Sequence, residues 1–314
     1  YEPGTPSPVP GAVPLPAVTI KPSDYPPLDK VPPINSPVVQ SWLKQIDLTK
    51  APSIKPTGLE GCNNQTFNPD QIAKAGKDGN CWWSCGGCTR AEDVTVCPNK
   101  GTWGASFDDG PSEFTPVLLD YLEKQKLKAT FFVVGSRAIS NPELLQAEYM
   151  ASHQQCIHTW SHPSLTTLTN EEIVAEIAWS MKAFQDIIGV TPNCFRPPYG
   201  DVDDRVRYIL KSMGLTNYIW TTGPSGSFDT EDWRVVAKQS TAKEASAEFQ
   251  KILSAQASLA TGFIVLAHDL FAEAVALSIN SFLPAAKEFP NLKVEPIATC
   301  LGLESRQNFF ETAS

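Results

Sequence analysis

The sequence predicts an α/β fold in which a parallel sheet closes, or nearly closes, into a barrel. Two observations support this prediction. From Lys100 onward, short apolar runs typical of strands alternate with longer stretches of helical periodicity. Ionisable residues follow several of the apolar runs directly, and the C-terminal ends of parallel strands are where such folds position their active sites.

The predicted elements follow one another in a regular order. Strands are expected near 102–107, 129–134, 154–158, 193–197, 216–220, 262–267 and 293–297. Helices are expected near 113–126, 171–188, 204–213, 235–255 and 272–288. In the first predicted helix, Val117, Leu118, Tyr121 and Leu122 have the spacing of a face that packs on a core.

Composition divides the chain of 314 residues into four parts. Residues 1–60 contain about half of the 27 prolines and show no sustained periodicity, so this Pro-rich N-terminal extension is either a free linker or a strap laid over the domain. Within it, the amphipathic stretch 38–46 is expected to dock on the core. We further expect a cysteine-rich, disulfide-bounded segment at 61–99, the α/β domain at 100–303 and a C-terminal tail at 304–314.

Eight cysteines, an even number, are typical of a protein that folds in an oxidising compartment. They are Cys62, Cys81, Cys85, Cys88, Cys97, Cys156, Cys194 and Cys300. Five lie close together without a nearby histidine, which favours disulfide loops over a zinc knuckle. Cys62 could pair with Cys300, whereas Cys156 and Cys194 could pair or stay reduced. The pair Trp82-Trp83 is interpreted as packing over the disulfides, with a platform for stacking sugars as the alternative.

Other features indicate a secreted protein. Asn64-Gln65-Thr66 is the only acceptor sequence for N-glycosylation. The sequence starts at Tyr1 without Met or an apolar leader, so a signal peptide is expected to have been removed or omitted. Because a C-terminal anchor signal could have been trimmed after Ser314, the predicted location is either secreted or attached to the cell surface or cell wall.

Charge and hydropathy argue against two kinds of partner. The net charge of −9 and the lack of a basic stripe argue against nucleic acid. No apolar run in the sequence is long enough to span a bilayer.

The most informative segment is Ser106-Phe107-Asp108-Asp109-Gly110. Two adjacent carboxylates end a predicted strand, and the glycine and Pro111 break the chain at once, so that both carboxylates can turn toward one spot at the rim of the sheet. Paired carboxylates can divide the work of catalysis, one holding a metal and the other moving a proton. Taken alone, such a segment is more often an ordinary solvated turn.

The histidines strengthen the metal interpretation. The chain has only four, and two of them lie in His158-Thr159-Trp160-Ser161-His162, one helical turn apart. We expect this pair where a strand ends and a helical turn begins, with both imidazoles facing one point. Two histidines and one aspartate are a common ligand set for a divalent transition metal, and the alternative is a capping or packing role.

Two more segments place ionisable groups after predicted strands. Arg196 precedes a stiff Pro-Pro-Tyr-Gly turn, and its planar guanidinium suits the Asp108 carboxylate. The turn itself could aim a backbone N–H at a developing oxyanion. His268 follows the apolar run 263–267. The alternatives are a rigid loop with a surface arginine and a core histidine satisfied by hydrogen bonds.

Five segments together resemble the ordered motifs of the NodB-homology polysaccharide deacetylases, carbohydrate esterase family 4. They lie at 106–110, 158–162, 196–200, 229–233 and 265–268. The resemblance covers roughly 97–303, and the residues around the motifs are most similar to the fungal chitin deacetylase branch. It implies the distorted (β/α) barrel of that family and makes 100–303 the catalytic domain.

The resemblance also implies the metal site and its base. Asp109, His158 and His162 would hold a divalent metal, most often zinc in the family, with Co²⁺ or Mn²⁺ as alternatives. Asp108 would be the general base for the attacking water. Arg196 would anchor Asp108.

The remaining roles concern the leaving group and the acetyl group. By resemblance, His268 would protonate the departing sugar amine, and Asp232 would orient His268 and keep it protonated. The backbone N–H of Tyr199, together with the metal, would stabilise the oxyanion. Trp233 and Leu266 would wall the pocket that receives the acetyl methyl group.

The resemblance implies hydrolysis of N-acetyl groups from the N-acetylglucosamine units of chitin, giving chitosan and acetate. An amide is a poor electrophile with a poor leaving group, so its hydrolysis needs an activated nucleophile, oxyanion stabilisation and an acid for the nitrogen. Two alternatives are hydrolysis of O-acetyl esters on another wall or capsule polysaccharide, and a non-catalytic wall-binding protein on the same fold.

Overall fold

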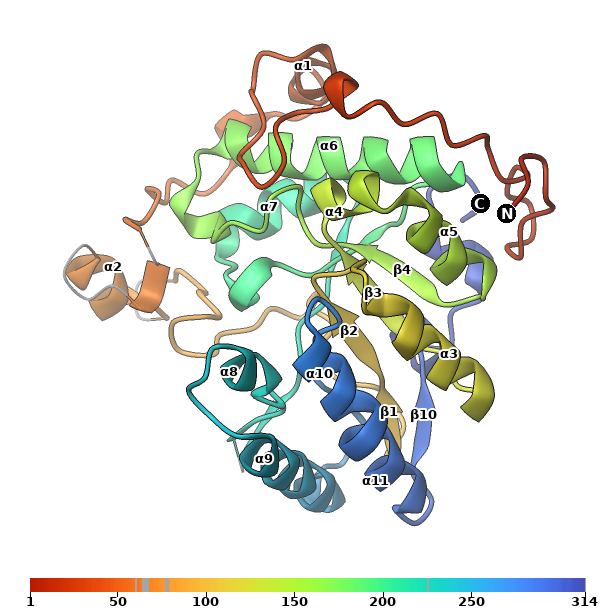
Figure 1. Cartoon of the computed structure of the whole chain (residues 1–314). Coiled ribbons are helices and arrows are strands. Elements are labelled where there is room, and N and C mark those ends of the chain that lie inside the picture. The colour runs from red at the N-terminus through yellow and green to blue at the C-terminus, as the bar shows by residue number, and fades with distance from the viewer. Residues whose placement is uncertain (60, 64–67, 77–78, 225, 314) are drawn as a thin grey trace.

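Short parallel strands form the centre of the molecule, and helices surround them (Figure 1). The structure is a computed structural model that describes residues 1–59, 61–63, 68–76, 79–224 and 226–313, so the predicted glycosylation acceptor at Asn64 lies outside the described residues. The parallel strands are β1 (Thr102–Gly104), β2 (Ser106–Asp108), β3 (Thr130–Val133), β4 (Gln154–Ile157), β5 (Cys194–Phe195), β6 (Thr216–Asn217), β9 (Phe263–Ile264) and β10 (Lys293–Glu295).

These strands form two sheets, in the orders β2-β3-β4-β5-β6 and β10-β1-β9. Backbone hydrogen bonds beyond the regular strands join the two sheets. The Asp108 N–H donates to the Ala267 carbonyl over 2.9 Å, and the Thr221 N–H donates to the Ile264 carbonyl over 3.0 Å. The result is a ring of parallel strands with irregular joints, which confirms the predicted distorted barrel.

The helices cover the outside of this ring, and most begin and end at residues with clear local reasons. They are α1 (Pro37–Leu43), α2 (Pro69–Lys74), α3 (Thr115–Gln125), α4 (Gly135–Ser140), α5 (Pro142–Met150), α6 (Asn170–Ile188), α7 (Asp204–Ser212), α8 (Asp232–Val236), α9 (Ala242–Ala255), α10 (Ala272–Leu277), α11 (Leu283–Glu288) and α12 (Ile297–Cys300). Helix α6, for example, begins at a capping box between Thr169 and Glu172 and ends at Gly189, which has a φ of 78°.

Two of the predicted helices are not continuous in the structure. The stretch 235–255 is divided between α8 and α9, because Lys238 has a left-handed φ of 57° and Thr241 starts a new helix through a capping box with Glu244. The stretch 272–288 is divided into α10, a π-helical segment and α11. Pro284 lies in the first turn of α11, and the lack of an N–H on proline accounts for the irregular turn before it.

Several short elements were not expected from the sequence. Helices α4 and α5 follow β3 and are separated by Asn141, because the residue before Pro142 is disfavoured in a helical conformation. The strands β7 (Thr222–Gly223) and β8 (Gly226–Ser227) form a small antiparallel ribbon.

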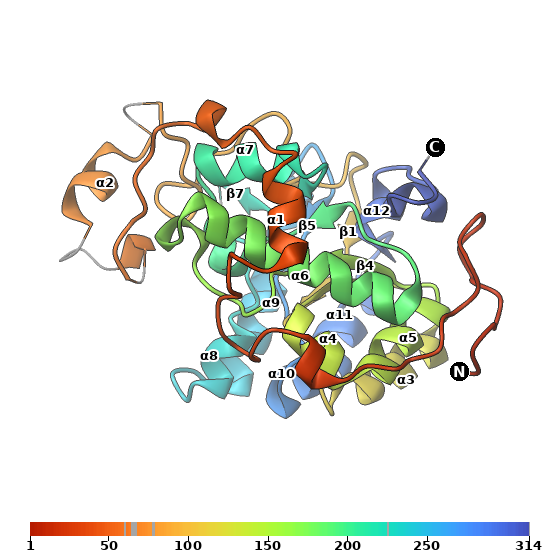
Figure 2. The same ribbon diagram turned by 90° about the horizontal axis from the view of Figure 1, so that it is seen from above.

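The N-terminal segment lies over the domain as a strap rather than as a free linker. Helix α1 packs across α6, as the view from above shows (Figure 2), and Val39 is completely buried there. The Trp179 indole donates to Ser36 Oγ over 3.2 Å, and the Trp160 indole donates to the Pro27 carbonyl over 3.1 Å. The strap therefore contacts the segment between His158 and His162. The four-part division of the chain stays a prediction.

All eight cysteines form disulfides. The pairs are Cys62–Cys85, Cys81–Cys88, Cys97–Cys300 and Cys156–Cys194. The suggested Cys62–Cys300 bond is therefore wrong, because the 61–99 segment folds back on itself and leaves Cys97, beside β1, as the partner of Cys300. The alternative that Cys156 and Cys194 stay reduced is also excluded, since they pair between the adjacent strands β4 and β5.

The Cys97–Cys300 bond is expected to contribute most to stability. The double variant Cys97→Ser/Cys300→Ser should lose about 2–5 kcal/mol of free energy of unfolding. The bond joins residues 203 positions apart, so its removal frees the unfolded chain far more than removal of a short-range bond. Denaturant titration followed by tryptophan fluorescence measures the loss. The matched control is Cys81→Ser/Cys88→Ser, with a separation of 7, and an equal loss there would contradict the prediction.

Candidate active site

Two adjacent carboxylates reach the same point at one end of the barrel. Asp108 is the last residue of β2, and Asp109 has a φ of 80°. The usual alternation of side-chain direction along a strand is therefore broken between these two residues. The Asp109 N–H donates to the Phe132 carbonyl over 3.1 Å, and Arg137 donates to the Asp109 carbonyl over 2.8 Å. These bonds hold the turn that the sequence predicted after this strand.

The two histidines come from an irregular loop. His158 follows β4, but no helical turn begins there, because Thr159 and His162 have left-handed φ values of 66° and 61°. The expected helical turn is therefore wrong, and the next helical residues begin at Leu165. The two imidazole rings nevertheless come together, with ring centroids 5.0 Å apart.

Asp109, His158 and His162 form a group that suits a metal ion. One ligand atom from each lies within 4.8 Å of the other two. Asp109 Oδ1 is 3.3 Å from His158 Nε2 and 3.0 Å from His162 Nε2, yet this buried oxygen accepts no hydrogen bond from the described residues. Three ligand atoms of this kind around one point are the usual protein contribution to an open divalent metal site.

The protonation of His158 supports the same interpretation. Its Nδ1 lies 2.7 Å from the Arg196 carbonyl, and because a carbonyl can only accept, Nδ1 carries the proton. Burial lowers the pKa of His158, so the ring is neutral and Nε2 presents a lone pair toward the Asp109 carboxylate. Burial works to raise the pKa of Asp109, but the neighbouring His162 and His158 lower it well below its usual range. Two acceptors facing each other fit a cation between them.

Asp108 is held beside this group by a buried arginine. The Arg196 guanidinium is completely buried and donates to Asp108 Oδ1 over 2.6 Å and to Ser106 Oγ over 3.0 Å. It also lies 3.8 Å from the centre of the Phe132 ring, a cation–π distance. Asp108 Oδ2 is 3.9 Å from His158 Nε2, so one carboxylate oxygen is anchored while the other faces the histidine group.

A second charged pair joins the site next to Asp108, through the bridge between Asp108 and His268. Asp232 is completely buried at the start of α8, and its two oxygens accept from Nδ1 and from the backbone N–H of His268 over 2.6 and 2.8 Å. Burial tends to lower the pKa of His268, but the charge and hydrogen bond of Asp232 outweigh it and raise that pKa to about 10. His268 is therefore a cation at neutral pH, with Nε2 left to face the site.

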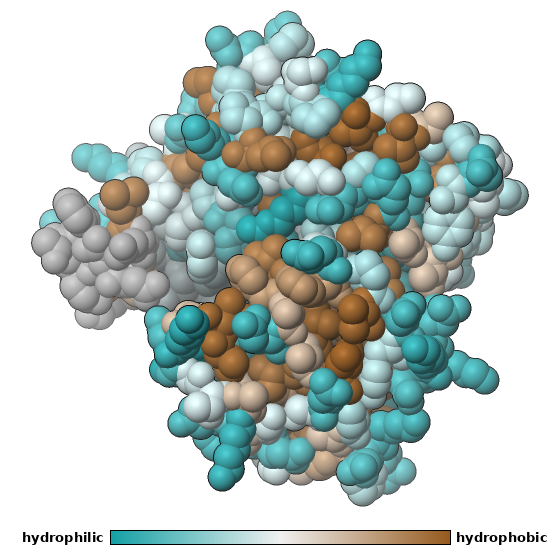
Figure 3. All heavy atoms as spheres, viewed as in Figure 1, coloured by the Kyte–Doolittle hydropathy of each residue, from teal (hydrophilic) through white to brown (hydrophobic). Residues whose placement is uncertain are grey.

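The three residues predicted around the acetyl group differ in their exposure. Tyr199 lies in a tight turn with a φ of 59° and its side chain is 62% exposed. Trp233 lines a hollow of about 230 Å³ together with Asp109, His268 and Phe271. Apolar side chains gather over α8 and α10 on this face (Figure 3). Leu266 is buried and is not among the described residues that line this hollow, so its role stays a prediction.

Sequence reasoning missed three buried acids that position the site. Glu176 on α6 accepts from the Trp160 and Ser161 N–H groups, each over 2.8 Å, and so fixes the histidine loop. Asp269 accepts from the Gly110 N–H and the Thr115 hydroxyl, which fixes the loop after Asp109. A charged residue on an otherwise apolar helix face was the available signal for Glu176.

Asp201 is the third of these acids. It accepts five hydrogen bonds, from Trp82 and Ser84 to one oxygen and from Ser164 and Thr166 to the other. The cysteine-rich segment is thereby joined to the loop that follows His162.

Comparison with known proteins places this geometry in context. The model of the polysaccharide deacetylase family matches residues 95–218. Chitin deacetylase 1 of Cryptococcus neoformans var. grubii is 50% identical over 311 residues, covering 98% of this chain and 64% of the relative. Chitin deacetylase of Amylomyces rouxii is 40% identical over 199 residues, covering 62% of this chain and 45% of the relative.

A solved structure agrees with the sequence matches. The chitin deacetylase of Colletotrichum lindemuthianum aligns with a TM-score of 0.62 and 27% identity, covering 70% of this chain and 95% of that one. The chain spans less than two thirds of the length of the relatives from Cryptococcus neoformans and Amylomyces rouxii.

The geometry predicts different effects for the same substitution at neighbouring aspartates. Asp109→Asn should weaken Zn²⁺ binding by about 100-fold, because Asp109 Oδ1 lies nearest both Nε2 atoms. Asp108→Asn is the matched control and should retain the metal, because Arg196 occupies one oxygen of Asp108. Metal content after dialysis against a competing chelator measures both. If Asp108→Asn loses the metal and Asp109→Asn keeps it, the two assignments are reversed.

Proposed function

The chain belongs to the polysaccharide deacetylase family, and from this premise we propose that it removes N-acetyl groups from the N-acetylglucosamine units of chitin, giving chitosan and acetate. One observation carries the proposal. A metal-binding group of one aspartate and two histidines lies beside an arginine-held carboxylate, and the Asp108–His268 bridge brings an aspartate-held imidazolium to the same rim. Amide hydrolysis needs a nucleophile, a base and an acid in such an arrangement.

Asp109, His158 and His162 would hold the ion, for which we propose Zn²⁺, with Co²⁺ or Mn²⁺ as alternatives. When bound, a divalent ion lowers the pKa of water and polarises a carbonyl. The donor set fits this ion because it offers two imidazole nitrogens and one carboxylate oxygen and leaves other positions for ligands. The second nitrogen of His158 is already fixed by the Arg196 carbonyl.

Asp108 acts as the general base for the attacking water. Its Oδ1 is bonded to Arg196, so Oδ2 is the oxygen that takes the proton. The guanidinium charge also limits how far Asp108 can rotate, which keeps the free oxygen directed toward the histidine group. Arg196 thus works through Asp108 and does not contact the substrate in this mechanism.

His268 acts as the acid that completes the reaction. Collapse of the tetrahedral adduct expels an amine only when the nitrogen gains a proton, and His268 carries one at neutral pH. Asp232 holds the ring by Nδ1, so Nε2 is the atom that donates. The Tyr199 N–H would stabilise the oxyanion, and Trp233 would contact the acetyl methyl group.

The proposed setting is outside the cell. Four disulfides are typical of an oxidising compartment, and an insoluble wall polymer is found there. We propose a secreted protein that associates with the cell wall. In the described part of the chain, no helix combines the length and apolar character required to cross a membrane.

Acetate release is the direct test of this function. The protein should release acetate from N-acetylglucosamine oligomers, and a chelator should stop the release until Zn²⁺ is restored. Quantification of acetate in each condition provides the measurement. Release only from O-acetylated glycans would favour esterase activity instead, and binding of the polymer without any release would favour a non-catalytic wall protein.

The acid role of His268 predicts a pH effect. Without the Asp232 charge, burial lowers the pKa of His268 below its present value of about 10, so the acid form is lost as the pH rises through the new, lower pKa. Asp232→Asn should therefore move the alkaline limb of the kcat profile down by several pH units. The same fractional loss of kcat at every pH, acidic and alkaline alike, would argue against this role.

A further inference from the structure

A second cavity adjoins the candidate active site. Its volume is about 540 Å³, which is in the usual range for small-ligand pockets, and its lining includes His162 and Tyr199. The smaller hollow at Trp233 is lined by Asp109 and His268 instead. Because Asp109 Oδ1 and His162 Nε2 are 3.0 Å apart, the two cavities meet at the metal-binding group.

The far wall of this cavity comes from the cysteine-rich segment. Trp83, Ser84 and Cys62 line it, and they precede the residues that match the polysaccharide deacetylase model. The Trp83 ring packs edge-on against Trp220 with centroids 4.6 Å apart. It also lies so close to Gly200 that a Cβ there would be 2.2 Å from the ring. These contacts fix the orientation of the indole.

The polar groups of the cavity suit a neutral, hydroxyl-rich ligand. Ser84 and Ser164 donate their hydroxyl protons to Asp201 over 2.6 and 2.9 Å, so both present lone pairs as acceptors to a ligand. The five donors around Asp201 occupy its carboxylate. Among the described lining residues there is no lysine or arginine, which argues against an anionic ligand.

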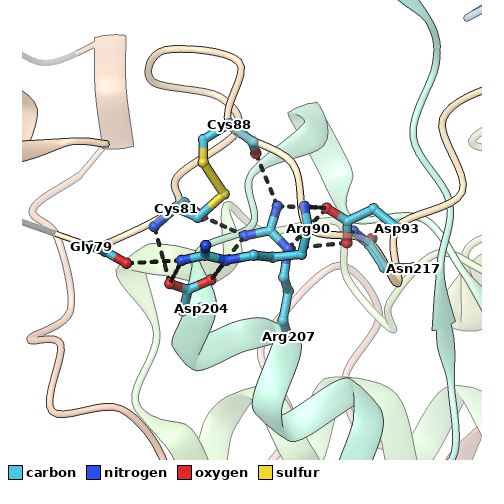
Figure 4. Close-up of a disulfide and its surroundings, with 8 residues drawn as sticks. All are labelled: Gly79, Cys81, Cys88, Arg90, Asp93, Asp204, Arg207 and Asn217. Atoms are coloured by element: carbon cyan, nitrogen blue, oxygen red, sulfur yellow. Dashed lines mark hydrogen bonds and ion pairs between the residues drawn. A yellow bond between two sulfur atoms is a disulfide. The ribbon is translucent and has the colours of Figure 1, made fainter. Parts of the chain in front are cut away.

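A charged network holds the cysteine-rich segment in place (Figure 4). Asp204 accepts from the Cys81 N–H over 3.1 Å and from Arg90 Nε over 2.9 Å. Arg207 donates to the Cys88 carbonyl over 3.1 Å and to Asp93 over 3.0 Å. Because Asp204 and Arg207 lie on α7, directly after the turn at Tyr199, the segment is fixed relative to the active site.

We propose that the cysteine-rich segment forms a sugar-binding subsite, in which Trp83 stacks on the sugar unit next to the one being deacetylated. An aromatic face suits the apolar face of a pyranose ring, and the serine oxygens accept from its hydroxyl and amide groups. The subsite rests on the proposed function for its ligand, a neutral N-acetylglucosamine chain. Through this subsite, the cysteine-rich segment helps to determine the length of the sugar chain that the protein prefers.

The test compares substrates with and without neighbouring sugars. Trp83→Ala should lower kcat/KM for the N-acetylglucosamine hexamer by about tenfold, roughly the value of one aromatic contact. It should leave kcat/KM for 4-nitrophenyl acetate unchanged, because that ester has an acetyl group but no neighbouring sugar. Trp83→Phe should restore most of the hexamer rate, since it keeps an aromatic face and less bulk at Gly200.

The matched control is Trp42→Ala, which removes another partly buried tryptophan, from α1 on the outer face. If the wild-type protein turns over the hexamer and both Trp83→Ala and Trp42→Ala lose the same fraction of kcat/KM, the subsite is overturned. An equal loss on 4-nitrophenyl acetate and on the hexamer in Trp83→Ala would overturn it as well.

Calorimetry with the hexamer separates the subsite from the proposed function. In an Asp108→Asn background, which prevents turnover, the hexamer should bind about tenfold more weakly when Trp83 is also replaced by Ala. If the hexamer binding depends on Trp83 and the protein with Asp108 intact releases no acetate, the subsite is retained and the deacetylase function is rejected. Binding unaffected by Trp83→Ala would reject the subsite.

Discussion

The buried Arg196 side chain is the interaction on which the rest of the site depends. Its guanidinium donates to Asp108, and its own carbonyl accepts from His158 Nδ1. One residue therefore orients the proposed base and one proposed metal ligand together. An unpaired guanidinium at this depth would be costly, and removal of one partner from a buried ion pair typically costs about 3–5 kcal/mol. The strand end that carries Arg196 is thus fixed by charge as well as by sheet pairing.

The barrel converts separate strand ends into one charged cluster. Parallel pairing brings β2, β4 and β5 into one sheet, so that Asp108, His158 and Arg196 meet at the same rim. The isolated bridge between Asp108 and His268 adds the fourth group from the other sheet. Buried acids hold the two histidine segments in place. Asp232 accepts two hydrogen bonds from His268, and Glu176 accepts from the backbone of the loop between His158 and His162.

The sequence was sufficient for those features that depend on residue type at strand ends. The pairing of Arg196 with Asp108 was predicted because the two side chains have complementary charges. The pairing of Asp232 with His268 was predicted from the resemblance to the family motifs. The conformation of the histidine loop was not, because left-handed φ values at Thr159 and His162 arise from hydrogen bonds to distant residues such as Glu176. The disulfide partners were not predicted either. They depend on how the 61–99 segment folds back, and the spacing of the cysteines does not reveal this.

A crystal structure with anomalous scattering recorded at the zinc edge tests the central claim most directly. The account predicts one zinc ion bound by Asp109, His158 Nε2 and His162 Nε2, with Asp108 outside the coordination sphere and still paired with Arg196. An ion coordinated by Asp108, or bound away from the two histidines, would contradict it.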